Sequence, residues 1–254
     1  MIPKIIHYVW LGGKPLTEMG EKCLASWKKF CPEYEIMRWD ENNFDINSNQ
    51  YVLDAYNAKK FAFASDYIRL YAMVKHGGVY MDTDVEVLKS LDQFLEHQAF
   101  SGFERPQQIP TGIMACEEDF PLFKELLKEY ETRKFINEDG SFNTTTNVRY
   151  ITDKCLEKGL VLNNIKQDVD GFILYPTDYF CPKDYETKQL NLTENTATIH
   201  HFDGSWLSKA AKKEMYLKAK YQKKYGKNWK IPFAIAHPIL SIKISKRSKG
   251  ENTK

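Results

Sequence analysis

The residues best suited to chemistry lie in the first third of the chain, where an acidic pair follows a short apolar run. Residues 79–85 predict a buried strand, and Tyr80, Asp82 and Asp84 alternate along it and so project to one side. Two ionised carboxylates this close repel each other unless a cation joins them. A hard divalent ion such as Mg²⁺ or Mn²⁺ would do so, and would then bind a diphosphate through its oxygens.

A second pair of charged residues precedes this strand. Apolar residues recur at three- and four-residue intervals over 61–76, which predicts a helix that ends at Gly77-Gly78. Asp66 and Arg69 are three residues apart on this helix and therefore share a face. The guanidinium of Arg69 suits a phosphate or a sugar hydroxyl, and Asp66 can accept hydrogen bonds from hydroxyls. The four charged residues together suit the departure of a nucleoside diphosphate from a sugar.

Two other functions remain open. An Asp-x-Asp pair after an apolar strand also occurs in phosphatases of the haloacid dehalogenase type, which usually carry Thr or Val two residues further on. Glu86 occupies that position here, which weakens this alternative. A non-catalytic module that binds sugar nucleotides or polysaccharides is the second alternative, and the intact acidic pair argues against it. Asp66 and Arg69 could also form a simple surface ion pair.

The remaining elements predict the α/β class with a mixed, mainly parallel central sheet, because strand and helix patterns alternate along the chain. Further strands are expected at 5–10, 34–39, 99–103, 112–115, 172–175 and 197–201, and further helices at 17–30, 121–133 and 205–225.

Charge divides the chain unevenly. Of 254 residues, the last fifty carry fourteen Lys or Arg and two Glu, a net +12, while the first 204 carry a net −10. We therefore expect a catalytic domain at 1–206 and a basic C-terminal helix and tail at 207–254. The tail, in which Trp229, Phe233 and Ile235 lie among basic residues, predicts contact with an anionic membrane surface rather than with nucleic acid. Five scattered cysteines without a Cys-x-x-Cys motif, and the lack of a signal peptide or a long apolar segment, favour the cytoplasm.

Three ordered blocks, at 5–13, 64–69 and 77–84, resemble the Asp-x-Asp (DXD) sugar transferases of glycosyltransferase family 32, which include capsular polysaccharide enzymes and yeast mannosyltransferases. The same order is similar to the glucosyltransferase domain of the large clostridial toxins. Residues 200–206 resemble the closing metal and diphosphate segment of such enzymes. The resemblance implies a GT-A type fold, a nucleotide-sugar donor (a UDP-sugar first), Mn²⁺ or Mg²⁺, and retention of anomeric configuration. It also implies a glycan or lipid-linked saccharide acceptor in surface polysaccharide synthesis.

The resemblance also implies a role for each matching residue. Val9 and Trp10 would hold and stack the nucleobase, and Asp66, Arg69 and Tyr80 would hold the donor sugar and diphosphate. Asp82 and Asp84 would bind the metal, with His201, or alternatively His200, and Ser205 completing its shell; Trp206 would close over the diphosphate. The chain departs from the family at 144–147 and near Gly112, both on the acceptor side.

Overall fold

The computed structural model describes residues 1–110, 112–205, 209–242 and 244. They form two compact units, one of residues Met1–Lys183 with Asn191–Asp203, and one of Asp184–Leu190 with Gly204–Lys254. The boundary expected at residue 206 stays a prediction.

The larger unit is built on a seven-stranded sheet of the described residues with the order β2-β1-β3-β6-β5-β8-β7. The strands are β1 Ile5–Val9, β2 Glu35–Trp39, β3 Gly78–Met81, β5 Ala99–Gly102, β6 Ile113–Cys116, β7 Gln167–Val169 and β8 Phe172–Tyr175. Only β6 and β7 run against the other five strands. The expected α/β class with a mixed, mainly parallel sheet is therefore confirmed.

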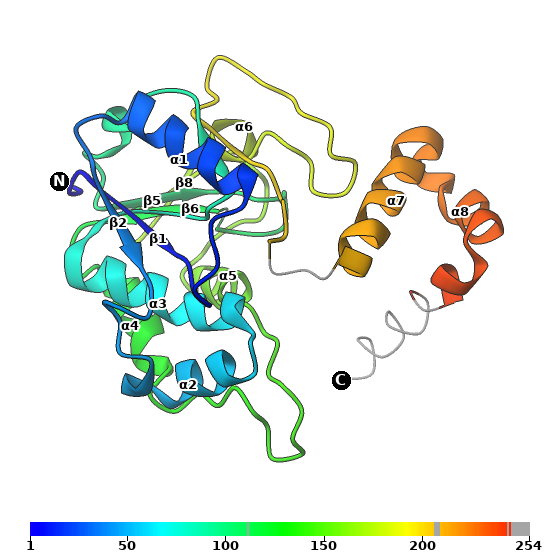
Figure 1. The fold of residues 1–254 in the computed structure, drawn as a ribbon. Helices are drawn as coiled ribbons and strands as arrows, with labels where there is room; N and C mark the ends of the chain where they lie inside the picture. Colours follow the sequence, from blue (N-terminus) through cyan, green and yellow to red (C-terminus); the bar gives the residue numbers. More distant parts are fainter. Residues whose placement is uncertain (111, 206–208, 243, 245–254) are drawn as a thin grey trace. The chain divides into compact units, whose positions relative to one another are not determined.

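Helices cover both faces of this sheet (Figure 1). Helix α1 (Glu18–Phe30) places Trp27 in one core cluster, together with Val79 and Met81 of β3. Helix α3 (Phe61–His76) packs Ile68 against the opposite face, in the cluster that holds Tyr80. The remaining helical segments of this unit are η1 Ile46–Ser48, α2 Gln50–Asn57, η2 Asp92–Phe94, α4 Pro121–Glu129, α5 Asn147–Glu157 and α6 Thr177–Phe180.

The single strand expected over 79–85 is wrong. Strand β3 ends at Met81, and the chain turns at Asp82 before β4 (Val85–Val87) begins. The turn forms because the Val85 amide donates to the carbonyl of Asp82 at 3.0 Å. Strand β4 then pairs with β9 (Thr198–His200) in a separate antiparallel ladder. The acidic pair therefore lies on a turn at the carboxyl end of β3, where α/β sheets place their ligands.

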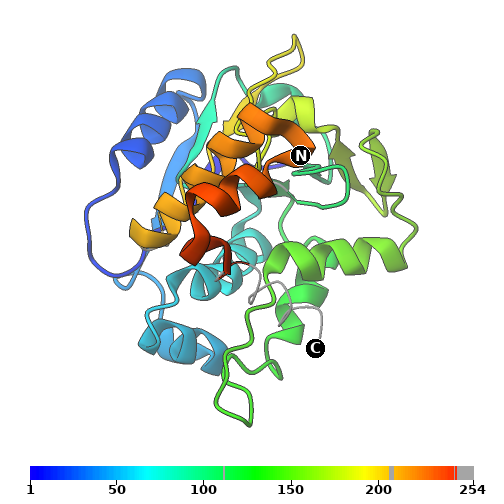
Figure 2. The ribbon, with the colours of Figure 1, turned by 90° about the vertical axis from the view of Figure 1, so that its right-hand side faces the viewer.

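The smaller unit contains α7 (Lys209–Tyr225), η3 (Gly226–Asn228) and α8 (Lys230–Ala236), with α7 and α8 side by side (Figure 2). Phe233 is buried, with ring contacts to Tyr221, Trp229 and His237. Phe233 thus belongs to the core of this unit, and the membrane contact expected of the tail stays a prediction. Among the described residues, no helix combines the length and the apolar character that a membrane span needs.

Candidate active site

The acidic turn gathers three groups that could hold a metal ion. Ligand atoms of Asp82, Asp84 and His200 all lie within 4.8 Å of one another. The Nε2 atom of His200 is 3.4 Å from Asp84 Oδ1 and 4.0 Å from Asp82 Oδ2. The β4–β9 ladder produces this meeting, because it pairs His200 with Val85, the residue that follows Asp84.

The electrostatics of this cluster link Asp84 to His200. Burial alone would raise the pKa of Asp84, but His200 and the backbone amide of Asp203, which donates to Asp84 Oδ2 at 2.8 Å, lower it to about 2. Burial likewise opposes the charged form of His200, yet Asp84 holds its pKa well above the ordinary value. The turn is therefore built for a positive charge beside Asp84, which the imidazolium supplies when no other cation does.

His201, the residue after β9, contacts a different carboxylate. Its Nε2 atom is 2.7 Å from Glu86 Oε2, and Lys22 pairs with the same carboxylate at 2.9 Å. Successive side chains of a strand point to opposite faces, so only one of the two histidines can reach the acidic turn. The structure brings His200, and not the expected His201, to Asp82 and Asp84.

Asp66 and Arg69 adjoin the acidic turn, and they form more than a surface ion pair. One guanidinium nitrogen of Arg69 lies 3.3 Å from Asp66 Oδ1 and 3.3 Å from Asp82 Oδ1. The guanidinium also stacks 4.6 Å from the ring centre of Tyr80, whose hydroxyl donates to Asp82 Oδ1 at 2.9 Å. Arg69 thus connects the helix to the turn through contacts that are largely shielded from water.

Asn147 is part of this arrangement and was not expected from the sequence. At the start of α5, its backbone amide donates to Asp66 Oδ2 at 3.0 Å and its side-chain amide donates to the Asp66 carbonyl at 2.9 Å. Burial raises the pKa of Asp66 to about 6, although Arg69 and the Asn147 amide both favour the ionised form. The departure from the family pattern at 144–147 was the available signal for Asn147.

The residues expected to hold the nucleobase lie at the end of β1. Val9 is buried, and Trp10 is half-buried with its indole donating to the Lys14 carbonyl at 2.7 Å. A hollow of about 620 Å³ lies beside this segment, lined by Gly12, Gly13, Glu41, Asn42, Tyr56, Asn57, Lys59 and Phe61.

Gly12 shapes this hollow. Its φ is +89°, and a Cβ atom there would lie 2.5 Å from the ring of Phe61. Its amide donates to Glu41 Oε1 at 2.6 Å. Glycine therefore permits both the backbone turn and the close approach of an aromatic ring.

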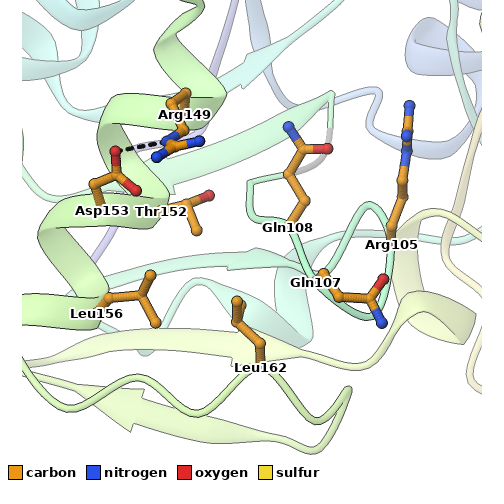
Figure 3. Close-up of a pocket in the computed structure, with 8 residues that line it drawn as sticks. All are labelled: Arg105, Gln107, Gln108, Arg149, Thr152, Asp153, Leu156 and Leu162. Atoms are coloured by element: carbon orange, nitrogen blue, oxygen red, sulfur yellow. Dashed lines mark hydrogen bonds and ion pairs between the residues drawn. The ribbon is translucent and has the colours of Figure 1, made fainter. Parts of the chain in front are cut away.

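The expected closing segment is described only in part. Ser205 is exposed in a turn of the smaller unit, and Trp206 lies outside the described residues. A separate hollow of about 390 Å³ lies between α5 and residues 105–108 (Figure 3). On its wall Arg149 pairs with Asp153 at 2.7 Å. The acidic turn does not line this hollow.

Comparison with known proteins gives a family match over the region that carries most of this site. Residues 17–101 match the model of a glycosyltransferase sugar-binding region containing a DXD motif. The matched residues include Asp66, Arg69, Asp82 and Asp84. They do not include Trp10, His200 or His201. The resemblance expected from the sequence is confirmed over this region.

Individual relatives also carry glycosyltransferase names. Inositol phosphoceramide mannosyltransferase 3 of Schizosaccharomyces pombe is 28% identical over 135 residues, which cover 50% of this chain and 36% of that protein. An uncharacterized glycosyltransferase, L373, of Acanthamoeba polyphaga mimivirus is 27% identical over 201 residues, which cover 72% of this chain and 76% of that protein. The chain thus spans little more than a third of the length of the fungal relative.

Among solved structures, the apo form of the glycosyltransferase GlyE of Streptococcus pneumoniae superposes with a TM-score of 0.48. It is 9% identical, over 98% of this chain and 64% of that one.

Proposed function

We propose that this protein is a metal-dependent glycosyltransferase that moves a hexose from a nucleotide-sugar to a hydroxyl group of a saccharide or lipid-linked acceptor. One observation carries the proposal: a cluster of Asp82, Asp84 and His200 adjoins the Asp66–Arg69 pair through a shared contact at Asp82. A cation site beside a buried arginine matches a donor that combines a diphosphate with a sugar.

The donor atoms of the cluster fit Mg²⁺ or Mn²⁺. Both ions prefer carboxylate oxygen, and imidazole is an acceptable ligand for the softer Mn²⁺. We infer that Asp84, Asp82 and His200 would hold the ion. Such an ion would neutralise the diphosphate as it leaves the sugar.

The side chains around the cluster would bind and orient the donor. The guanidinium of Arg69, held by two carboxylates and the Tyr80 ring, can donate a hydrogen bond to a phosphate oxygen as negative charge develops there. Asp66 is fixed by Asn147 and can accept hydrogen bonds from sugar hydroxyls. We nominate no side chain as a covalent nucleophile. A retaining route in which the departing phosphate helps to deprotonate the acceptor needs none.

The nucleobase would bind at the end of β1, near Val9 and Trp10 and the hollow beside Gly12. UDP-sugars are the first donors to test, within a panel of nucleotide-sugars. The similarity to a fungal protein named as an inositol phosphoceramide mannosyltransferase supports a hexose donor and a lipid-linked acceptor.

Metal-dependent hydrolysis of the donor tests this function. Asp84→Asn should lower Mn²⁺-dependent hydrolysis of the best donor at least about 100-fold. The substitution removes the charge of a metal ligand but keeps the shape of the side chain. The matched control is Asp170→Asn in the exposed turn between β7 and β8, which should retain wild-type turnover.

Each competing function has its own outcome. Wild-type donor hydrolysis by Asp84→Asn contradicts the metal assignment. Release of orthophosphate from simple phosphomonoesters, with no need for a nucleotide, identifies a phosphatase. Tight binding of a nucleotide-sugar by the wild-type chain without turnover, in the presence of Mn²⁺ and acceptors, identifies a binding module.

We further propose that the smaller unit attaches the protein peripherally to the cytoplasmic face of a membrane. The net +12 charge of the last fifty residues and the exposed isoleucines of α8 support this partner. Attachment would bring the active site near lipid-linked acceptors.

A further inference from the structure

The second nitrogen of the His200 ring points away from the proposed metal site, toward a carboxylate that has not been given a role. His200 Nδ1 is buried and makes no hydrogen bond to a described residue. It lies 3.5 Å from Glu104 Oε1, on the segment that follows β5. The carboxylate has 13% of its side-chain surface exposed, so the structure shields it from solvent.

The imidazole is held in this orientation from several sides. The Phe202 ring lies 4.1 Å from the His200 ring, centre to centre, and the Cys181 thiol also interacts with the imidazole. On the remaining side is Gly112, where a Cβ atom would lie 3.0 Å from His200 Nδ1 and 2.9 Å from Val85. The ring therefore presents Nε2 to the aspartates and Nδ1 to Glu104.

We propose that Glu104 is a positioning residue for the metal site, which fixes the tautomer and the orientation of His200. A neutral histidine carries one proton, and a carboxylate beside Nδ1 favours the tautomer with the proton on that atom. When a metal ion takes the place of the Nε2 proton, the lone pair of Nε2 would be available to it beside Asp82 and Asp84. Metal-binding histidines commonly donate their other N–H to a carboxylate in this way, which also makes the ligand more basic. The inference rests on the proposed metal-dependent function.

A metal-binding measurement on the full chain tests this role without a turnover assay. Glu104→Ala should weaken Mn²⁺ binding about 10- to 100-fold, measured by the loss of the free-ion electron paramagnetic resonance signal. Glu104→Gln keeps an acceptor for the Nδ1 proton and should restore most of the affinity. In Co²⁺-loaded protein, Glu104→Ala should also shift the visible absorption bands, because the orientation of the imidazole ligand changes.

The adjacent histidine supplies a matched control. Glu86 contacts His201 as Glu104 faces His200, and both carboxylates are partly buried. Glu86→Ala should leave Mn²⁺ affinity within about twofold of wild type. The reverse pattern, with weaker binding in Glu86→Ala alone, would assign the metal to His201 and overturn the inference.

Two further outcomes separate this inference from the proposed function. If Asp84→Asn abolishes Mn²⁺ binding while Glu104→Ala leaves it unchanged in affinity and in the Co²⁺ spectrum, the metal site stands and the role of Glu104 is wrong. If Asp84→Asn also binds Mn²⁺ as the wild type does, the metal site itself is wrong. Thermal unfolding of each variant identifies those that fail to fold. If Glu104→Ala is one of them, the Co²⁺ spectrum of Glu104→Gln decides, because an amide oxygen is a weaker acceptor than a carboxylate: shifted bands support the inference and wild-type bands overturn it.

Discussion

Asp66 is held as an ionised carboxylate in a place that disfavours its charge. Only 7% of its surface is exposed, and burial raises its pKa from 3.8 to about 6 despite the nearby guanidinium of Arg69. The folded state therefore binds this proton more tightly than the unfolded chain does. Above about pH 6 the ionised group costs stability, and that cost is relieved as the pH falls through 6 toward 3.8.

Replacing Asp66 should therefore stabilise the protein while it impairs the site. We expect Asp66→Asn, in buffer with a chelator, to increase the free energy of unfolding at pH 8 by about 1–3 kcal/mol, since one pKa unit is worth about 1.4 kcal/mol. The gain should shrink as the pH falls below 6, and donor hydrolysis should be lost. Urea unfolding of both proteins at pH 8 and at pH 5 measures the gain in stability and its decrease with pH. A variant less stable than wild type at pH 8 would mean that attraction to Arg69 outweighs burial.

Residue types and spacing predicted which charged side chains would meet at the site. They predicted less well which histidine would join the two aspartates. The Asp66–Arg69 spacing and the Asp-x-Asp pair were sufficient to place four charged groups together. The choice between His200 and His201 depends on which face of β9 turns toward the acidic turn, and that is determined by the register with β4. Glu104 comes from a distant segment with no motif around it.

Among the elements, those with local start and stop signals were the predictable ones. The helix expected over 61–76 has those bounds in the structure, because Gly77 ends it with a φ of +60°. Helix α5 was missed, since it follows a run of threonines and carries residues of modest helix propensity such as Asn147, Val148 and Tyr150. The break after Met81 was missed because alternation of apolar and acidic residues continues through the turn.

Strand β1 depends on a neutral histidine. His7 is fully buried, its Nδ1 accepts from the Trp39 indole at 3.1 Å, and its Nε2 donates to the Gly77 carbonyl at 2.9 Å. Burial lowers the pKa of His7 to about 4. The unfolded chain, in which this pKa is near 6.5, therefore binds the proton first on acidification, and the stability from His7 is lost as the pH falls from about 6.5 to about 4.

His7→Gln should flatten the acid side of the stability profile. It is expected to be less stable than wild type at pH 7.5, because one glutamine cannot reproduce both hydrogen bonds, but its free energy of unfolding should fall less between pH 6.5 and 4.5. The contribution of Asp66 has the opposite sign over nearly the same range. The comparison is therefore made between Asp66→Asn and the double variant Asp66→Asn with His7→Gln. Between pH 6.5 and 4.5, we expect the free energy of unfolding of Asp66→Asn to fall by up to about 3 kcal/mol more than that of the double variant. Parallel profiles would show that His7 does not control the acid response.

The composition alone shows that residues 1–204 and 205–254 carry opposite net charges. It does not show which apolar and basic side chains of the second part are exposed. The sequence suggested Phe233 as an apolar contact, whereas the structure buries it and exposes Ile231 and Ile235 of α8, at 71% and 78%. Lys213, Lys220 and Lys224 of α7 are exposed as well. Exposed isoleucines in a lysine-rich unit match the interface of an anionic bilayer. There, apolar side chains enter the boundary of the acyl region, and the ammonium groups of lysines contact the lipid headgroups.

Vesicle sedimentation tests that partner on the full chain. The wild type should pellet with phosphatidylcholine vesicles that contain phosphatidylserine, less so in high salt, and little with phosphatidylcholine alone. Ile231→Ser with Ile235→Ser should reduce the bound fraction at least about tenfold, because burial of an isoleucine side chain is worth about 1.5–3 kcal/mol. The control pair, Val161→Ser with Ile165→Ser, removes apolar chains exposed at 57% and 60% in the larger unit and should bind as the wild type does. Equal recovery in the soluble fraction with and without residues 229–254 would contradict the membrane assignment.

A second copy of the chain is the alternative partner for this face. It is identified if the wild type does not bind vesicles but dimerises in solution, and if the Ile231→Ser and Ile235→Ser changes abolish the dimer.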